Sequence, residues 1–147
     1  MHEEIVAVTP EVEDDENEAI EVVTPATYYL KNGKHYIVYE EVVEGTSGVI
    51  KNRIKINGEE CVEIVKSGLS NSHMIFEKNK KNQTFYKTPY GQMLIGVNTR
   101  RLQVDFEEDK IAVQIDYELD VNHEPMADCK IRMNIVSKDS GKFSVLS

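Results

Sequence analysis

Hydrophobic and polar residues alternate with a period of two along most of the chain after residue 25. Turn-forming residues interrupt this alternation about every 8 to 12 positions, a spacing typical of all-β sandwiches and barrels. No long segment places its apolar residues at the helical spacing. The pattern therefore predicts an all-β fold made of consecutive antiparallel strands.

The clearest predicted strand covers residues 110–121, and residues 128–136 form its expected neighbour. One face of the first strand is apolar and consists of Ile111, Val113, Ile115, Tyr117, Leu119 and Val121. One antiparallel register of the two strands places apolar residues opposite apolar residues on one face and acids opposite bases on the other. Its apolar pairs are Leu119 with Ile131 and Tyr117 with Met133. Its charged pairs are Glu118 with Arg132 and Asp120 with Lys130. The acids of this strand are therefore interpreted as cross-strand partners of basic residues and not as a catalytic array.

Two Asn-Gly dipeptides, at residues 32–33 and 57–58, predict β-hairpins. A plain two-residue turn at the second dipeptide would mix apolar and polar residues on each face. A three-residue loop with Gly58 in the left-handed conformation keeps the faces consistent and sets Ile50 opposite Ile64. The bulged hairpin is the predicted form.

Two further turns are predicted nearer the C-terminus. Thr88-Pro89-Tyr90-Gly91 has the composition of a turn, because Pro fixes the first central position and Gly closes it. Residues 107–109 form the other turn and set Phe106 opposite Ile111. The remaining strands are expected at residues 34–43, 47–56, 60–66, 70–77, 83–87, 92–97 and 102–106.

The N-terminal residues allow two structures. Thr9-Pro10-Glu11 has the features of a helix start, with a capping Thr, Pro at the first helical position and an acid near the positive end of the dipole. In a helix, however, the acids from Glu11 to Glu18 would lie at like-charge spacings with no Lys between them. The alternative is a strand at residues 4–10, an acidic connection and a strand from about Ala19. The strand interpretation is favoured, and both structures stay open for residues 11–23.

Charge is concentrated at this end of the chain. The 147 residues include 17 Lys and Arg against 26 Asp and Glu, a formal net charge of −9. Nine of the acids lie within residues 1–24, which contain no Lys or Arg, so the remainder is balanced. The net charge alone argues against nucleic-acid and anionic-membrane partners, but the balanced remainder does not.

Length and composition predict one domain over residues 1–147, with an acidic strand-turn segment at 1–24 and a loose tail at 138–147. The 40% of apolar residues can bury a core without a disulfide or a structural metal. Cys61 and Cys129 lack a CxxC motif and are interpreted as reduced core residues. No signal peptide or membrane span is recognised, so a cytoplasmic protein without a membrane partner is expected.

Several short motifs occur in a characteristic order, namely Tyr28-Tyr29-Leu30, Asn32-Gly33-Lys34, Tyr36-Ile37-Val38-Tyr39-Glu40-Glu41, Ser67-Gly68, and Tyr86-Lys87-Thr88-Pro89-Tyr90-Gly91 followed by Thr99. Through these motifs the chain resembles the YwiB-like bacterial family from about residue 4 to residue 137. The resemblance implies a calycin fold, an antiparallel up-and-down β-barrel similar to lipocalins, with about 8 to 11 strands. The family is uncharacterised, so the resemblance implies no site residues. Lipocalins carry Gly-x-Trp in their first strand, whereas this chain has no Trp.

A barrel of this size is either filled by side chains or holds one small ligand. The candidate ligand contacts are residues in the interior phase of their strands, namely Tyr28, Tyr36, Tyr117 and Met133. A Tyr suits a binding cavity because its apolar ring ends in a polar group that orients a ligand. The alternative is a packed core whose hydroxyls reach the barrel mouth, and the ordinary number of aromatic residues favours that alternative.

The sequence contains no recognisable catalytic or cofactor motif. The four histidines, His2, His35, His73 and His123, are scattered and form no HxH or HExxH motif. A P-loop, a GxGxxG motif and a GxSxG elbow are absent, and residues 13–16 lack the spacing of an EF-hand loop. No metal, cofactor or enzymatic activity is therefore expected.

In a strict meander, successive turns alternate between the two ends of the barrel. One end then collects the turns at 13–18, 44–47, 67–69, 89–90 and 107–109, whose charges are all negative, and the turns at 31–34, 57–59, 78–82, 99–101 and 122–128 fall at the other. This other end carries three acids, Glu59, Glu124 and Asp128, against seven basic residues, namely Lys31, Lys34, Lys78, Lys80, Lys81, Arg100 and Arg101. The barrel would then be electrically polar along its axis, with Lys51, Arg53 and Lys55 extending the basic side. Turn charges that serve only solubility are an equally good interpretation.

Two functions follow as hypotheses. In the first, the protein is a non-enzymatic calycin-like binding protein that takes a small amphipathic or anionic ligand at the barrel mouth. In the second, a filled barrel is an interaction module for another protein or a nucleic acid, acting through its basic end and outer strand face. Nucleic acid is the weaker partner because few aromatic residues accompany the lysines. An open cavity favours the first function, and a solid core favours the second.

Overall fold

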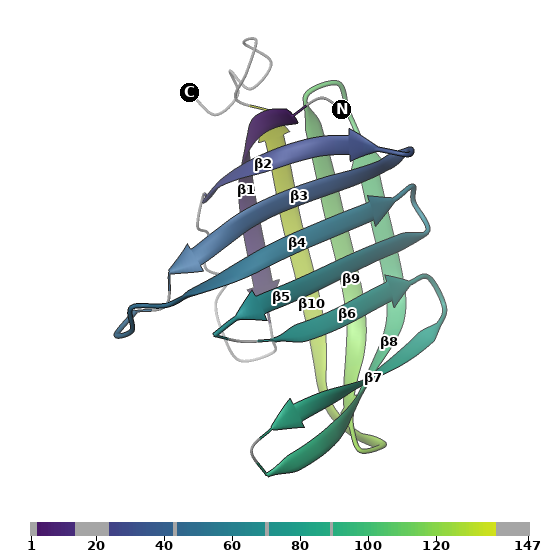
Figure 1. The fold of residues 1–147 in the computed structure, drawn as a ribbon. Coiled ribbons are helices and arrows are strands. Elements are labelled where there is room, and N and C mark those ends of the chain that lie inside the picture. Colours follow the sequence, from purple (N-terminus) through teal and green to yellow (C-terminus); the bar gives the residue numbers. More distant parts are fainter. Residues whose placement is uncertain (1–2, 14–23, 43, 70, 89, 138–147) are drawn as a thin grey trace.

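The computed structural model describes residues 3–13, 24–42, 44–69, 71–88 and 90–137. These residues form ten β-strands and no helix (Figure 1). The strands are β1 (Glu3–Glu13), β2 (Thr24–Lys31), β3 (Lys34–Val42), β4 (Val49–Asn57), β5 (Cys61–Gly68), β6 (Ser72–Glu77), β7 (Lys81–Thr88), β8 (Gly91–Phe106), β9 (Lys110–Val121) and β10 (Glu124–Ser137). Every strand pair is antiparallel, so the predicted all-β antiparallel fold is confirmed.

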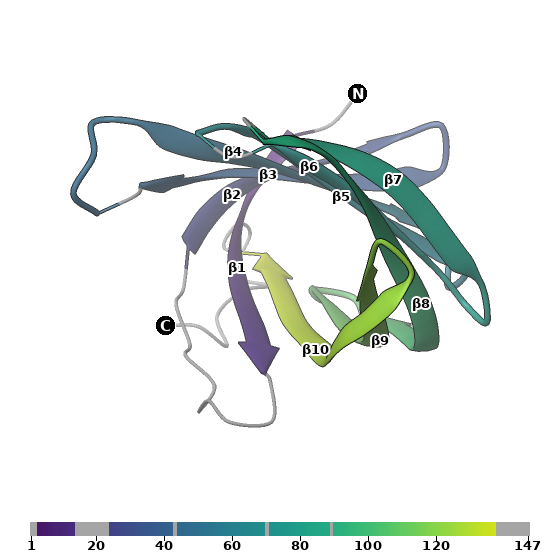
Figure 2. The ribbon, with the colours of Figure 1, turned by 90° about the horizontal axis from the view of Figure 1, so that it is seen from below.

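The strands form one sheet in which neighbours in sequence pair with each other, except β6 and β7, which are its two edges. β1 also pairs with β10, so it joins the first and last parts of the chain. In Figure 1, β2 to β6 lie in front and cross β1, β10, β9 and β8 behind them, and Figure 2 shows the sheet curling around its interior. The result is an up-and-down barrel. At its seam, a short turn leads from β6 to β7, and the Thr99 N–H donates to the Lys80 carbonyl at 3.0 Å.

Alternate residues of the strands point into the barrel and form its core. The most deeply buried side chains come from both layers and include Ile37, Ile54, Ile56, Phe76 and Ile115, all 0% exposed. The rings of Phe76 on β6 and Tyr117 on β9 meet edge to face, with centroids 4.9 Å apart. Because these residues belong to opposite layers, side chains fill the centre of the barrel.

The N-terminal strand decides between helix and strand for part of residues 11–23. Pairing with β10 continues to Glu13, so residues 11–13 are strand and not helix. The register sets Glu11 opposite Arg132 and Glu13 opposite Lys130, so acidic positions of β1 lie beside basic positions of β10. The predicted connection and strand start within residues 14–23, and the predicted tail at 138–147, lie outside the described residues.

Both Asn-Gly hairpins form, but one has an unexpected register. Asn32-Gly33 is a two-residue turn with φ values of 53° and 76°. The other hairpin has the predicted three-residue loop with Gly58 at positive φ, yet Ile64 pairs with Ile54 and not with Ile50. The predicted register is wrong because Gly58 begins the loop instead of ending it. The shift is an even number of residues, so every side chain keeps its predicted face.

The hairpin of β9 and β10 also departs from the predicted register. β9 has its predicted bounds, but β10 begins early because Asn122 and His123 adopt positive φ and reverse the chain in two residues. Ile131 therefore faces Ile115 and not Leu119. The predicted ion pairs are replaced by Arg132 with Asp116 at 3.4 Å, Arg100 with Glu118 at 2.6 Å and Lys81 with Asp120 at 2.5 Å.

The predicted turn at residues 99–101 is wrong. β8 runs without a break from Gly91 to Phe106, and its pairing with β9 only shifts between Thr99 and Arg101. Such a bulge bends a strand without ending it. The predicted pairing of Phe106 with Ile111 is confirmed.

The absence of this turn changes the charge of the barrel ends. In the observed meander, the acidic turn at 107–109 falls at the same end as the Asn32-Gly33 hairpin, because one expected reversal is missing. Contact between the rings of His35 and Phe106, 4.9 Å apart, places these two elements together. The predicted separation of acidic and basic turns is therefore wrong.

Candidate functional site

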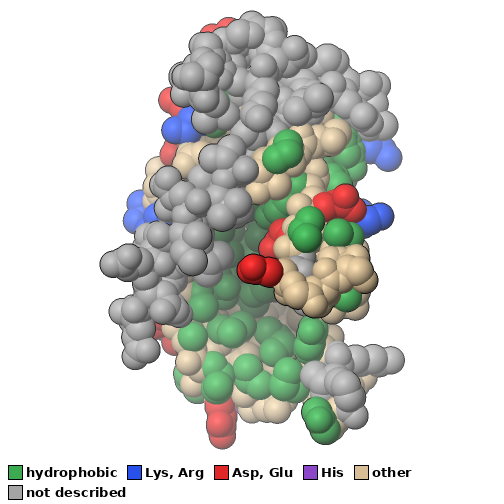
Figure 3. Space-filling view, turned by 90° about the vertical axis from the view of Figure 1, so that its left-hand side faces the viewer, with side chains coloured by type: hydrophobic (Ala, Val, Ile, Leu, Met, Phe, Trp, Pro, Cys, Tyr) green, Lys and Arg blue, Asp and Glu red, His purple; other side chains and the backbone are tan. Residues whose placement is uncertain are grey.

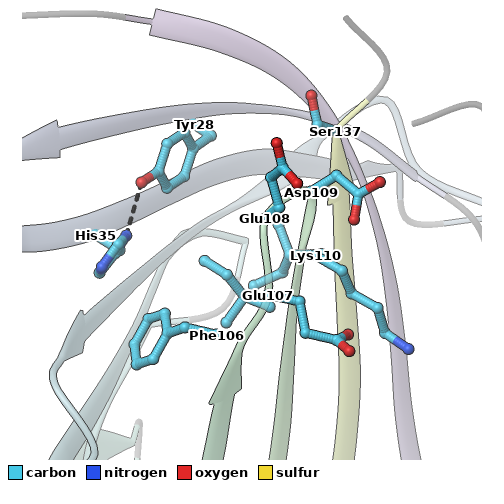
Figure 4. A pocket seen from close by; sticks show the side chains of 10 residues that line it. Tyr28, His35, Phe106, Glu107, Glu108, Asp109, Lys110 and Ser137 are labelled. Atoms are coloured by element: carbon cyan, nitrogen blue, oxygen red, sulfur yellow. Dashed lines mark hydrogen bonds between the residues drawn. The ribbon is translucent and has the colours of Figure 1, made fainter. Parts of the chain in front are cut away.

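A cavity of about 270 Å³ lies at the barrel end where the β2–β3 hairpin meets the turn between β8 and β9 (Figure 4). One wall is aromatic and consists of Tyr28, His35 and Phe106. Residues 107–110 of the turn form another wall, and Ser137 at the end of β10 lies beside them. The cavity thus brings together residues that are far apart in the sequence.

The aromatic wall follows from the strand alternation. Tyr28 pairs with the fully buried Ile37, and His35 lies two positions before Ile37, so both side chains point inward. Tyr28 Oη and His35 Nδ1 share a hydrogen bond of 2.7 Å. The His35 ring in turn packs on Phe106. This chain of contacts holds three rings in one orientation beside the cavity.

Burial also sets the charge of the histidine. Desolvation lowers the pKa of His35 below its ordinary value of 6.5, because a buried imidazolium loses its hydration. At neutral pH, the aromatic wall therefore carries no positive charge.

The turn wall carries three consecutive acids, Glu107, Glu108 and Asp109. The Glu107 N–H donates to the Lys110 carbonyl at 2.8 Å and closes the turn. The Ser137 N–H donates to the Asp109 carbonyl at 3.0 Å and ties the turn to β10. In Figure 4, Glu108 and Asp109 lie near Ser137, while the Lys110 side chain extends away from Tyr28 and His35. The backbone therefore holds this acidic turn in place.

Ser137 provides a polar group without a partner. The residue is 5% exposed, and its Oγ forms no hydrogen bond with the described part of the chain. Leaving a buried hydroxyl unpaired costs about 1–3 kcal/mol. A molecule in the cavity that bonds to this oxygen would recover part of that energy.

Comparison with known proteins places this barrel in a family. The model of the domain of unknown function DUF1934 matches residues 5–133. The chain belongs to this family. It is 32% identical over 114 residues to the "Uncharacterized beta-barrel protein YwiB" of Bacillus subtilis, covering 77% of this chain and 78% of that protein. The crystal structure of the ywiB protein from Bacillus subtilis superposes with a TM-score of 0.72 at 24% identity over 92% of each chain, so the two share a fold. The YwiB-like resemblance seen in the sequence is confirmed.

Within this family fold, the four predicted ligand contacts do not come together. Tyr28 lines the end cavity. Tyr117 and Met133 are buried in the core and do not line it. Burial, followed by the neighbouring Cys129, raises the pKa of the Tyr117 phenol, so this hydroxyl stays neutral. Tyr117 and Met133 are therefore packing residues in the observed structure.

Tyr36 is the clear error among the predicted contacts. Its neighbour Ile37 takes the inward position of β3, so Tyr36 lies on the outer face, where its ring stacks on Tyr29 at 4.9 Å. The same alternation sends His35 inward, although the sequence interpretation left its face open. Counting back two positions from Ile37 would have identified this histidine.

The predicted basic residues are close in space but largely neutralised. Lys80 pairs with Glu77 at 3.4 Å, while Lys81 and Arg100 pair with acids of β9. Arg101 donates to the Gln103 amide oxygen at 2.9 Å. Lys78 is exposed at the turn after β6 and has no charged partner among the described residues. Most of this positive charge is therefore used within the protein.

A second cavity of about 520 Å³ is lined by Ala26, Tyr39 and Lys51, among others. Figure 3 shows hydrophobic side chains in a hollow on the side where β2 begins and β3 ends. Burial and the neighbouring Glu41 raise the pKa of Tyr39 to about 12. Glu41 Oε1 accepts hydrogen bonds from Asn52 at 2.6 Å and from Lys66 at 3.2 Å. Glu41 is thus paired within the protein, but the acid that lines this cavity is its neighbour Glu40.

Among the described residues, the structure contains no helix with the length and apolarity that crossing a bilayer requires.

Proposed function

We propose that this protein is a non-enzymatic binding protein that takes a small amphipathic molecule into the end cavity. The observation that supports this proposal is the cavity itself, in which aromatic rings face an acidic turn and an unpaired buried hydroxyl. Binding sites commonly combine an apolar surface with a few polar groups that orient the ligand.

The size of the cavity supports a small ligand. A water molecule occupies about 30 Å³ in the liquid, so a volume of about 270 Å³ accommodates a molecule with a single ring and a short chain. The ligand would bind at the barrel end, because the contact between Phe76 and Tyr117 fills the centre.

Two polar groups of the cavity wall bond to each other. The hydrogen bond between Tyr28 Oη and His35 Nδ1 fixes the orientation of both rings. The pair therefore serves to orient the wall of the cavity.

The surface hypothesis has weaker support. Lys80, Lys81 and Arg100 each have a carboxylate partner, so a protein or nucleic acid would have to compete for them. Charge neutralised in this way gives little attraction for an anionic partner.

NMR titration with single-ring fragments of neutral, cationic and anionic character tests the proposed function. At least one fragment is expected to shift the amide signals of Tyr28, His35 and Phe106. The variant Ile111→Phe, which fills the cavity from β9, should abolish these shifts. Ile95→Phe is the matched control, because this half-buried isoleucine lies outside the cavity lining. If no fragment shifts these signals, or if both variants bind equally, the proposal is wrong.

A further inference from the structure

The charge around the end cavity indicates the chemical class of its ligand. We infer that the cavity selects molecules that carry a protonated amine on an apolar or aromatic body, an inference that rests on the proposed binding function. Three features of the cavity lead to this class.

The first feature is the lack of basic partners for the acidic turn. Lysine or arginine side chains of the described residues pair with five other acids of the barrel, namely Glu41, Glu77, Asp116, Glu118 and Asp120. No basic side chain of that part of the protein lies within ion-pair distance of Glu107, Glu108 or Asp109. Within the described residues, these three carboxylates therefore have no basic partner that a ligand cation would have to displace.

The second feature is the buried Ser137 hydroxyl. Its Oγ has no partner among the described residues and lies beside the acidic turn, to which its own backbone N–H is bonded. An alkylammonium group has three N–H donors. One donor can reach a carboxylate while another bonds to Oγ, which a neutral apolar ligand cannot do.

The third feature is the aromatic wall opposite. The faces of Phe106 and Tyr28 attract a cation within about 6 Å of the ring centre. His35 adds no positive charge at neutral pH because burial favours its neutral form. An anion, in contrast, would meet three carboxylates of its own sign, with the single ammonium group of Lys110 in the described lining to offset them. The anionic ligand considered from the sequence alone is therefore disfavoured at this cavity.

Three probes that share a phenyl ring and a short chain test the inference. They are 2-phenylethylamine, 2-phenylethanol and 3-phenylpropanoate, each titrated into the full chain at neutral pH and low salt by NMR. The amine is expected to bind about tenfold or more tightly than the alcohol, and the propanoate more weakly than either. Added salt should reduce the preference for the amine, because it screens the exposed carboxylates.

Paired variants identify the acids responsible. Glu108→Gln and Asp109→Asn should weaken binding of the amine and leave binding of the alcohol unchanged. Glu124→Gln, which removes an exposed acid next to the β9–β10 turn, should change neither affinity. Ser137→Ala should reduce the preference for the amine by a smaller factor than the acid variants.

The outcomes separate the two proposals. Equal binding of amine and alcohol, or tighter binding of the propanoate, would overturn the amine class and leave the binding function standing. Failure of all three probes, together with all other fragments, would overturn the binding function itself. Acid variants that weaken amine and alcohol equally would indicate a structural role for the turn and refute the inference.

Discussion

At the scale of single residues, the cavity depends on which way each side chain of β3 points. His35, Ile37 and Tyr39 share the inner face, while Tyr36 stacks outside on Tyr29. Successive side chains of a strand point to opposite faces, so one deeply buried residue shows which face every other residue of that strand occupies. The inward position of His35 gives the site a group whose protonation depends on its burial.

Replacing His35 by Gln is expected to reduce the dependence of stability on pH. The pKa of His35 is lowered in the folded state, so the unfolded chain takes up the proton first as the pH falls. Its contribution to the free energy of unfolding is therefore full above about pH 6.5 and is lost as the pH falls below that value. Urea unfolding from pH 8 to pH 5 should show a shallower loss for His35→Gln than for the wild type.

His73→Gln serves as the control, because His73 lies exposed on another strand beside Glu63. An equal change of slope in both variants would show that burial of His35 does not govern this pH dependence.

At the scale of the elements, three strands meet around one ion pair whose acid is buried. Lys81 of β7 reaches across Gly96 of β8 to Asp120 of β9, with Nζ and Oδ2 2.5 Å apart. A Cβ on Gly96 would lie 3.0 Å from Lys81 Cε and 3.3 Å from Asp120 Cβ. The missing side chain of the glycine thus leaves room for the ion pair, which links the outer part of β7 to β9.

Lys81→Met is expected to destabilise the protein by about 1–3 kcal/mol, because it leaves the carboxylate of Asp120 buried and unpaired. Only 7% of the Asp120 side chain is exposed. Lys80→Met is the matched control, since its partner Glu77 is more exposed and such surface pairs contribute about 0–1 kcal/mol. Urea unfolding measures both, and equal losses would contradict a special role for the β7–β9 link.

At the scale of the whole molecule, the barrel depends on β1. This strand is hydrogen-bonded to β2 on one side and to β10 on the other, and it joins segments from opposite parts of the chain. Without it, β2 and β10 would both present unpaired edges, which favour aggregation. The acidic N-terminal segment therefore includes a structural strand, not only a charged extension.

Val8→Pro should open the barrel at this strand. Val8 lies opposite both Ile135 and Thr24, so Pro would remove a ladder hydrogen bond in the middle of β1. The expected loss is about 3 kcal/mol or more, a large part of the stability of a small domain. Val8→Thr keeps the backbone N–H and a β-branched side chain and should cost far less. Thermal unfolding followed by circular dichroism compares the two, and similar melting temperatures would show that β1 is dispensable.

Features that depend on residues close together in the sequence could be predicted, and features that depend on distant residues could not. Local alternation predicted the bounds and the inward residues of β9, and the Asn-Gly dipeptide predicted the turn at residues 32–33, whereas Tyr36 of β3 was assigned to the wrong face. The registers of β4 with β5 and of β9 with β10 were not, because registers that differ by an even number of residues keep the same faces. The bulge near Thr99 was missed since polar residues in mid-strand have the composition of a turn.

The sequence by itself determined the all-β class, the faces of the clearest strands such as β9, and the family, since these depend on residues close together in the chain. Only the tertiary structure decided the site. Tyr28 and His35, the acidic turn at 107–109, and Ser137 meet because β1 joins the ends of the chain and β8 continues through its bulge. Neither of these long-range pairings leaves a local pattern, because each depends on which distant strand supplies the hydrogen-bonding partner.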